Sequence, residues 1–267
     1  MDLISLKMRL SGYLARIPRA YAELIRLKKR YNKEKYIYLK LIQKGDTVIE
    51  GGANIGYFTR LFAQIIGKAG ELHAFEPTPS TFKILELNCA QAKLPHFPKL
   101  NCLGLSNKAG TATIHIPEGD SGQASLAPHK VGSWGGANTS STQSIMLTTL
   151  DNYSQQEELK KIDFLKLDIE GAELLALKGG INTLEAFLPI IHMEVCTHFL
   201  QDFDAQPKDL IRLLENLGYD RFLSYEQNIQ SPRDLRKLTS EALTKSLNVI
   251  CACSDIHRDR LKQLHWA

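Results

Sequence analysis

Three acidic residues follow an apolar segment in the middle of the chain. Phe164–Leu167 is typical of a short buried strand, and Asp168, Glu170 and Glu173 come directly after it around Gly171. Ligands of open α/β sheets bind at the carboxyl ends of strands, so these acids mark a candidate site. Acids also favour helix N-termini, but capping explains one of them better than three.

A later apolar strand, Pro189–Val195, carries His192 and Glu194. Residues two apart in a strand point to the same face, so we expect both to reach one pocket with Asp168. There, His192 or Glu194 could take a proton from an acceptor hydroxyl. Asp168 and Glu194 could instead hold Mg²⁺, which prefers oxygen ligands. A histidine in such a strand can equally be a core residue, and both interpretations stay open.

A glycine-rich segment, residues 48–59, predicts a strand, a tight turn and a helix. Gly51, Gly52 and Gly56 would let the backbone approach a ligand closely. Their spacing differs from the G-x-G-x-x-G of dinucleotide sites, and Glu50 before them would repel a phosphate. A carboxylate there can accept from an ammonium group, which S-adenosylmethionine carries. The turn therefore favours S-adenosylmethionine over a nicotinamide cofactor.

An acid also ends the second predicted strand, Glu71–Phe75. Glu76 lies 24 residues after Gly52, and a carboxylate offers two acceptor oxygens that can bind both hydroxyls of a ribose. We expect Glu50 to hold the amine of the cofactor and Glu76 its ribose. The other residues that we expect around the cofactor are Gly52, Asn54, Gly56, Tyr57 and Ser106.

Strands and helices alternate from residue 44 to the end, which predicts one α/β domain with a largely parallel sheet and helices on both faces. Further strands are expected at Leu100–Leu105 and Thr111–Ile116. The segment 117–145 is rich in glycine, serine, threonine and asparagine, and long insertions of this kind are often functional. It is a candidate substrate loop of the domain at 44–267.

The first 43 residues predict a helical arm. Apolar residues from Leu3 to Tyr31 step by three and four, which makes one stripe on a helix, and Pro18 should start a new helix. Residues 1–35 carry a net charge of +7, and the rest of the chain −3. The arm could contact its own domain, a second copy, or an anionic membrane surface. The charge distribution does not indicate a nucleic-acid partner.

The cysteines indicate neither a disulfide framework nor structural zinc. Five are present, an odd number, and none forms a C-x-x-C pair. Free thiols are typical of a reducing, cytoplasmic setting. The sequence contains no run of about 18 apolar residues and no signal-peptide pattern, so we expect neither a transmembrane span nor secretion.

Taken together, these segments resemble the FkbM-type methyltransferases. The matching motifs are Glu50, Gly52-Ala53-Asn54-Ile55-Gly56, Phe75-Glu76-Pro77, Thr149-Leu150-Asp151, Lys166-Leu167-Asp168-Ile169-Glu170-Gly171-Ala172-Glu173, and Pro189-Ile190-Ile191 with Glu194. The resemblance implies a seven-stranded, Rossmann-like class I fold and O-methylation of a sugar, glycan or natural-product hydroxyl. It also implies a cofactor pocket at Glu50, Gly52, Asn54 and Glu76. Glu50 stands where the family more commonly has aspartate.

Two other functions compete with methyl transfer. A nicotinamide-dependent dehydrogenase would share the fold, but the glycine spacing and Glu50 argue against it. A non-catalytic cofactor-binding or scaffold protein would retain the pocket without turnover. The acceptor itself cannot be named from the sequence.

Overall fold

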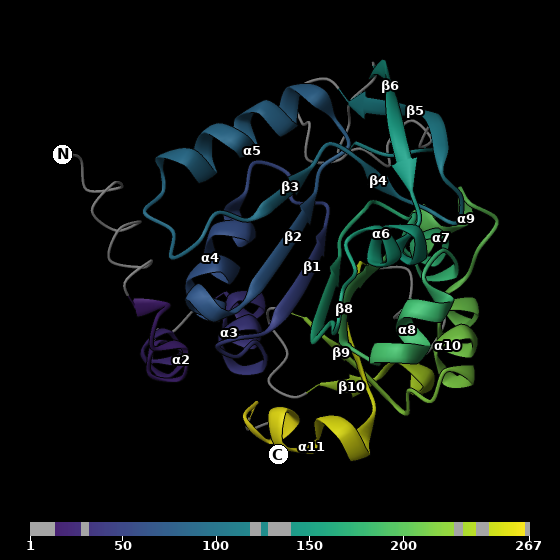
Figure 1. Ribbon diagram of the computed structural model, residues 1–267. Coiled ribbons are helices and arrows are strands. Elements are labelled where there is room, and N and C mark those ends of the chain that lie inside the picture. Colours follow the sequence, from purple (N-terminus) through teal and green to yellow (C-terminus); the bar gives the residue numbers. More distant parts are fainter. Residues whose placement is uncertain are drawn as a thin grey trace.

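A central eight-stranded sheet with helices on both faces forms the protein in this computed structural model (Figure 1). The structure describes residues 14–27, 32–117, 124–127, 140–226, 232–238 and 246–264. The strands of the large sheet are β1 (Thr47–Gly51), β2 (Glu71–Phe75), β3 (Lys99–Asn101), β7 (Phe164–Leu167), β8 (Ile190–Val195), β9 (Arg221–Tyr225), β10 (Arg233–Asp234) and β11 (Leu247–Ala252).

The sheet has the strand order β3-β2-β1-β7-β8-β11-β9-β10. The first five are parallel, and β11 runs antiparallel to both of its neighbours. The expected mostly parallel α/β fold is thus confirmed. The strand count is eight and not seven, because the short strand β10 pairs with the outer strand β9.

Side chains alternate between the two faces of the sheet, and a different set of helices packs on each face. Val48, Phe164 and Ile190 are aligned across three strands and are fully buried on one face, and the next residue of each strand is buried on the other. The helices over the first face are α2 (Pro18–Arg26), α3 (Lys33–Leu41), α4 (Tyr57–Ile66), α5 (Pro79–Gln91) and α11 (Ser254–Lys262). Those over the second are α6 (Leu150–Gln156), α7 (Glu173–Lys178), α8 (Ile181–Phe187), α9 (Thr197–Gln201) and α10 (Pro207–Asn216).

The N-terminal helices differ from the expected arm in two ways. Helix α2 starts at Pro18 as predicted, but the described part of the expected apolar stripe, including Ile17, Leu24 and Leu27, is exposed. Other residues of α2 face the protein. Helix α3 lies in the core, where Ile37 and Leu39 are fully buried, so it belongs with the domain and the arm does not extend to residue 43. Residues 1–13 lie outside the described part of the chain. No described helix combines the length and apolar character needed to cross a membrane.

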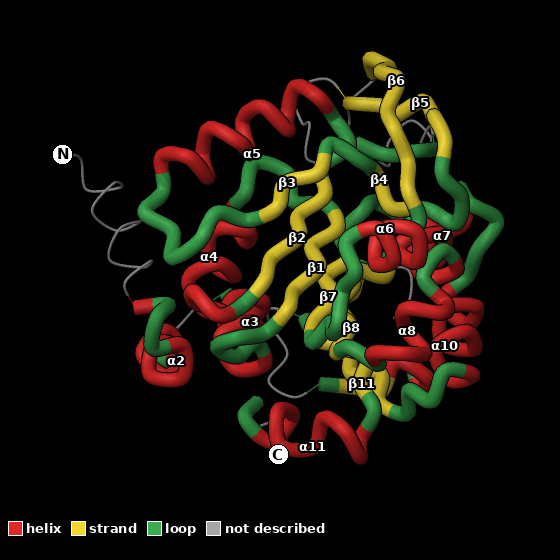
Figure 2. Tube along the Cα trace, viewed as in Figure 1, coloured by secondary structure: helices red, strands yellow, loops and turns green. Residues whose placement is uncertain are grey.

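A small second sheet lies beside the carboxyl ends of the parallel strands (Figure 2). It contains β4 (Gly104–Leu105), β6 (Ser140–Thr148) and β5 (Gly110–Pro117), in that order. The prediction of one strand at Leu100–Leu105 is therefore wrong, because this segment divides between the two sheets. The candidate substrate loop connects β5 to β6, and only its residues 124–127 and those of β6 are described.

Candidate functional site

The turn after β1 brings two distant strand ends into contact. Gly52 has φ +75°, and a Cβ atom on it would lie 1.9 Å from the carbonyl oxygen of Asp168, so only glycine fits. The amides of Gly52 and Ala53 donate to the carbonyl of Phe75 at 3.1 and 2.9 Å. The turn thus contacts the ends of both β7 and β2, which the sequence alone suggested only by spacing.

Glu76 accepts two backbone hydrogen bonds at the end of β2. Its Oε2 accepts from the amide of Asn54 at 3.0 Å and its Oε1 from the amide of Thr78 at 2.9 Å. Burial raises the pKa of the carboxyl group, and the amide and hydroxyl groups of Thr78 act against this rise. The expected proximity of Glu76 to the glycine-rich turn is therefore present in the structure.

These residues line one open cavity, whose empty space of about 770 Å³ includes solvent at its mouth. Its polar wall contains Gly52, Asn54, Glu76, Thr78, Asp168 and Glu170. Its apolar wall contains Leu103, Leu105, Ile114, Ala124, Leu126, Ile145 and Leu147. Most of the apolar wall comes from the β4–β6 region and from the described part of the inserted loop. This loop is tied to the site, because the Ser125 hydroxyl donates to the Glu170 carbonyl at 2.9 Å.

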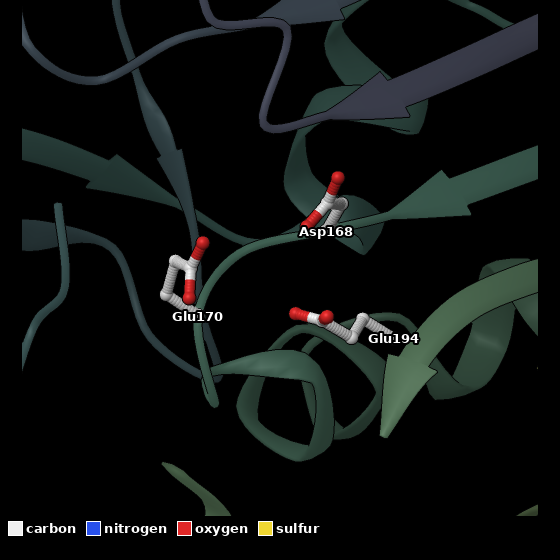
Figure 3. A group of neighbouring side chains, drawn as sticks. All are labelled: Asp168, Glu170 and Glu194. Atoms are coloured by element: carbon white, nitrogen blue, oxygen red, sulfur yellow. The ribbon is translucent and has the colours of Figure 1, made fainter. Parts of the chain in front are cut away.

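Asp168, Glu170 and Glu194 form an acidic cluster next to this cavity (Figure 3). One carboxylate oxygen from each lies within 4.8 Å of the other two. Burial and then the neighbouring Asp168 raise the pKa of Glu194, whose carboxylate also contacts the Ser246 hydroxyl. The structure thus brings together Asp168 and Glu194, as expected. Glu170, another of the three acids that follow β7 in the sequence, completes the cluster.

Lys166 connects the acidic cluster to the glycine-rich turn. Its side chain is 1% exposed, and its Nζ lies 3.2 Å from Asp168 Oδ2 and 3.4 Å from the Gly52 carbonyl oxygen. Burial alone would lower the pKa of this amine, but the carboxylates of Asp168, Glu50 and Glu34 together raise it. The ammonium group therefore stays charged. A lysine inside an apolar strand is the sequence signal for this role.

Glu50 faces helix α4 and does not line the cavity. It is 1% exposed and accepts a 2.7 Å hydrogen bond from the hydroxyl of Thr59. Burial raises its pKa to about 7, against the opposing effects of Lys166 and Thr59. This placement does not support the expected contact between Glu50 and the amine of a cofactor.

His192 is a core residue in this structure. Its ring nitrogens pair with the hydroxyl groups of Tyr38 at 3.0 Å and Tyr225 at 2.5 Å. Burial and the nearby Lys166 lower its pKa to about 3, so the ring is neutral. Because both nitrogens already have partners and the ring is 1% exposed, the structure does not place it to act as a base.

Three further residues that were expected around the cofactor do not line the cavity. Gly56 begins helix α4 with φ +84° and packs against Leu85 of α5. Tyr57 is half-exposed and contacts Phe58 edge-on. Ser106 is buried after β4, where its amide donates to the Thr148 carbonyl at 2.9 Å. In this geometry none of the three contacts the space inside the cavity.

The chain is similar in sequence to known methyltransferases. Residues 50–221 match the methyltransferase FkbM domain. The hexuronic acid methyltransferase AglP of Haloferax volcanii is 30% identical over 207 residues, which cover 76% of this chain and 77% of that protein. The 2-O-methyltransferase NoeI of Sinorhizobium fredii is 28% identical over 192 residues, 68% of this chain and 74% of that protein.

An S-adenosylmethionine-dependent O-methyltransferase from Thermotoga maritima aligns with 86% of this chain and 69% of its own, at 15% identity and a TM-score of 0.45. Family membership depends on the sequence match, which spans the glycine-rich turn, Glu76, the acidic cluster and most of the parallel sheet. The chain therefore belongs to the FkbM methyltransferase family.

Proposed function

We propose that the protein transfers a methyl group from S-adenosylmethionine to a hydroxyl group of a sugar, a glycan or a natural product. The observation that supports this most strongly is one cavity that contains Gly52, Asn54 and Glu76 together with Asp168. Glu76, whose carboxylate suits a ribose, and Asp168, whose carboxylate suits a charged or reacting group, thus lie in the same pocket.

The cavity walls match the parts of this cofactor. Each oxygen of Glu76 accepts one backbone amide and retains acceptor capacity for a ribose hydroxyl. The apolar wall with Leu103, Ile145 and Leu147 suits a purine ring. Asp168 would then face the cationic methionine end. When bound, the cofactor supplies a methyl group on a sulfonium, which is activated for transfer.

The chain's own contribution to the reaction is a group that accepts the proton of the acceptor hydroxyl. A sugar hydroxyl is a weak acid, so its proton needs an acceptor. Glu194 is suited to this role, because burial and Asp168 raise its pKa from the usual carboxyl range. Lys166 Nζ lies 3.2 Å from Asp168 Oδ2, and this ion pair favours an orientation of the Asp168 side chain toward the cavity. We therefore assign Glu194 as the base and Asp168 as its neighbour in the site.

A metal-assisted version uses the same residues. Asp168 and Glu194, together with Glu170, would hold Mg²⁺ through oxygen ligands, and the ion would lower the pKa of the acceptor hydroxyl. The ion pair of Asp168 with Lys166 already neutralises part of the negative charge, so we favour the metal-free version. Full turnover in EDTA supports this choice, and activity that returns only with added Mg²⁺ contradicts it.

The nature of the acceptor rests on the relatives. AglP is named for a hexuronic acid and NoeI for 2-O-methylation, which supports a sugar hydroxyl as the acceptor. Incubating cell extract with the protein and methyl-labelled S-adenosylmethionine, then fractionating the labelled product, would identify it. Saturable cofactor binding with no labelled product in any extract would favour the non-catalytic alternative.

Cofactor binding has its own test in Glu76→Ala. Losing a pair of charge-assisted hydrogen bonds should weaken S-adenosylmethionine binding by roughly ten- to a hundredfold in calorimetry. Glu71→Ala, at the exposed start of the same strand, is the matched control and should bind normally. Unchanged affinity in a folded Glu76→Ala protein would remove Glu76 from the cofactor site.

A further inference from the structure

Helix α2, at the outer edge of the molecule beside α3 (Figure 1), presents an apolar stripe to solvent. The members of the stripe are three or four residues apart, at Ile17, Ala20, Leu24 and Leu27. All four are exposed, with 55% for Ile17, 50% for Leu24 and 84% for Leu27. The helix packs on the domain through other residues, among them Tyr21 and Ile25, so the fold itself does not use the stripe.

The stripe continues a pattern in the preceding sequence. The same steps of three and four connect Ile17 to Leu3, Leu6, Leu10 and Tyr13. Single apolar residues on a protein surface are ordinary, but aligned ones over about three helical turns mark an interaction surface. At each described position this alignment faces away from the domain.

Positive charge accompanies the stripe. Arg19 and Arg26 are exposed on the same helix, and residues 1–35 as a whole carry a net charge of +7. The single acid of α2, Glu23, lies 3.1 Å from Arg26 and 2.5 Å from the buried Lys40. Two cations therefore share its charge, and the exposed side of α2 is both apolar and cationic.

This combination fits a lipid surface better than a second copy of the chain. Helices that lie in the interface of a bilayer join an apolar face to lysine or arginine residues, which contact anionic headgroups. A second copy would bring the same arginine residues to the same contact. Three aliphatic side chains also offer far less than the roughly 800 Å² that each partner of a stable protein complex buries.

We propose that α2 binds the surface of an anionic lipid bilayer, with Ile17, Leu24 and Leu27 in the interface and Arg19 and Arg26 at the lipid phosphates. The contact is peripheral and does not require a span. The proposal goes beyond methyl transfer and does not depend on it, because none of residues 17–27 lines the cavity.

Flotation of the full chain with lipid vesicles tests the proposal. Vesicles of phosphatidylcholine mixed with phosphatidylglycerol should bind the protein, and vesicles of phosphatidylcholine alone should bind it about ten- to thirtyfold more weakly, since each arginine near an anionic surface contributes about a factor of five. Added salt should release the protein from the anionic vesicles, because it screens the attraction.

The apolar stripe is tested by Leu24→Ser combined with Leu27→Ser. This variant should bind the anionic vesicles about tenfold more weakly or less, because the apolar area that enters the interface is lost. The matched control is Ile84→Ser combined with Leu87→Ser on α5. These two side chains are 47% and 59% exposed, but the charges of the neighbouring Lys83 and Glu86 balance, so the control should bind normally.

The charge is tested by Arg19→Gln combined with Arg26→Gln, which should lose about ten- to thirtyfold in binding to the anionic vesicles. The leucine and arginine variants should keep the melting temperature of wild type, since these side chains are exposed. No binding by the full chain, equal binding to both kinds of vesicle, or unchanged binding by the leucine variant would overturn the proposal. A leucine variant that loses an oligomer in lipid-free sedimentation, with vesicle binding unchanged, would assign the stripe to a second copy instead.

Discussion

Replacing Glu50 by glutamine should remove a pH dependence of folding that the natural chain carries. The carboxyl group is 1% exposed, accepts a hydrogen bond from Thr59, and has its pKa raised by burial from 4.5 to about 7. Glutamine keeps the shape and an acceptor oxygen for Thr59, but it cannot release a proton. The variant therefore isolates the effect of ionisation.

The sign and size of the effect follow from proton binding. Below pH 4.5 the carboxyl is protonated in both the folded and the unfolded chain, so its contribution to stability is fully present. As the pH rises toward 7, the unfolded chain releases the proton and the folded chain retains it, which favours unfolding. Above about pH 7 the loss is complete, and it amounts to roughly 3 kcal/mol at about 1.4 kcal/mol per pH unit.

Urea unfolding at pH 5, 6, 7 and 8, followed by circular dichroism, measures this directly. The free energy of unfolding of Glu50→Gln minus that of wild type should rise by roughly 2.5 kcal/mol from pH 5 to pH 8, because part of the loss has already occurred at pH 5. Glu173, whose pKa burial raises to about 8, is present in both proteins and cancels in the difference. Glu86→Gln, on the exposed side of α5, is the control. A difference that stays constant with pH would refute the reasoning.

The same variant tests the placement of Glu50 away from the cavity. Because its carboxylate is directed at Thr59 and not into the cavity, Glu50→Gln should bind S-adenosylmethionine within about threefold of wild type. A loss of about tenfold or more would mean that Glu50 contacts the amine of the cofactor, as the sequence suggested.

Three further changes test other parts of the structure. Gly52→Ala should abolish binding of S-adenosylhomocysteine and, in urea unfolding, destabilise the fold by about 3 kcal/mol or more, because its Cβ would overlap the Asp168 carbonyl. Gly45 also has a positive φ of +85° but has nothing within 4 Å of a Cβ, so Gly45→Ala should cost only about 1–2 kcal/mol in the same assay. Lys166→Met removes the cation beside the acidic cluster, so the acid limb of the pH–rate profile should move upward by about one pH unit; an unmoved profile would contradict its role. Deleting residues 1–17 should leave cofactor affinity intact but change sedimentation or liposome binding, and if neither changes, the arm has no role in association.

The sequence predicted the parts of the site that lie within a few residues of a strand end. Gly52, Glu76 and Asp168 each follow a parallel strand, and parallel strands end at the same edge of a sheet. Their convergence needs only the order of the strands and the rule that ligands bind at this edge. The glycine at residue 52 carries a further signal, since its positive φ and its contact with Asp168 exclude any side chain.

Other parts of the fold and of the site depend on contacts between distant segments, which no local sequence pattern shows. The segment Leu100–Leu105 looks like one strand, but its first half extends the large sheet and its second half starts the small one. The apolar wall formed by Ile114, Ile145 and Leu147 therefore could not be assigned to the cavity. The expected stripe on α2 was also misplaced, because apolar spacing does not say which of two faces the domain covers.

The positions of His192 and Glu50 away from the cavity have one physical cause. Glu50, Lys166 and His192 are aligned across β1, β7 and β8 and share one face of the sheet. His192 and Glu194 share this face of β8 as well, but they lie at different heights along the strand. At the level of His192 the face is covered by α3, and the Tyr38 hydroxyl forms a hydrogen bond with Nδ1 of His192. Glu194 lies one step nearer the carboxyl end of β8 and reaches the acidic cluster. Which polar residues of a strand can meet a ligand is therefore decided by where the covering helix ends, and that depends on tertiary packing.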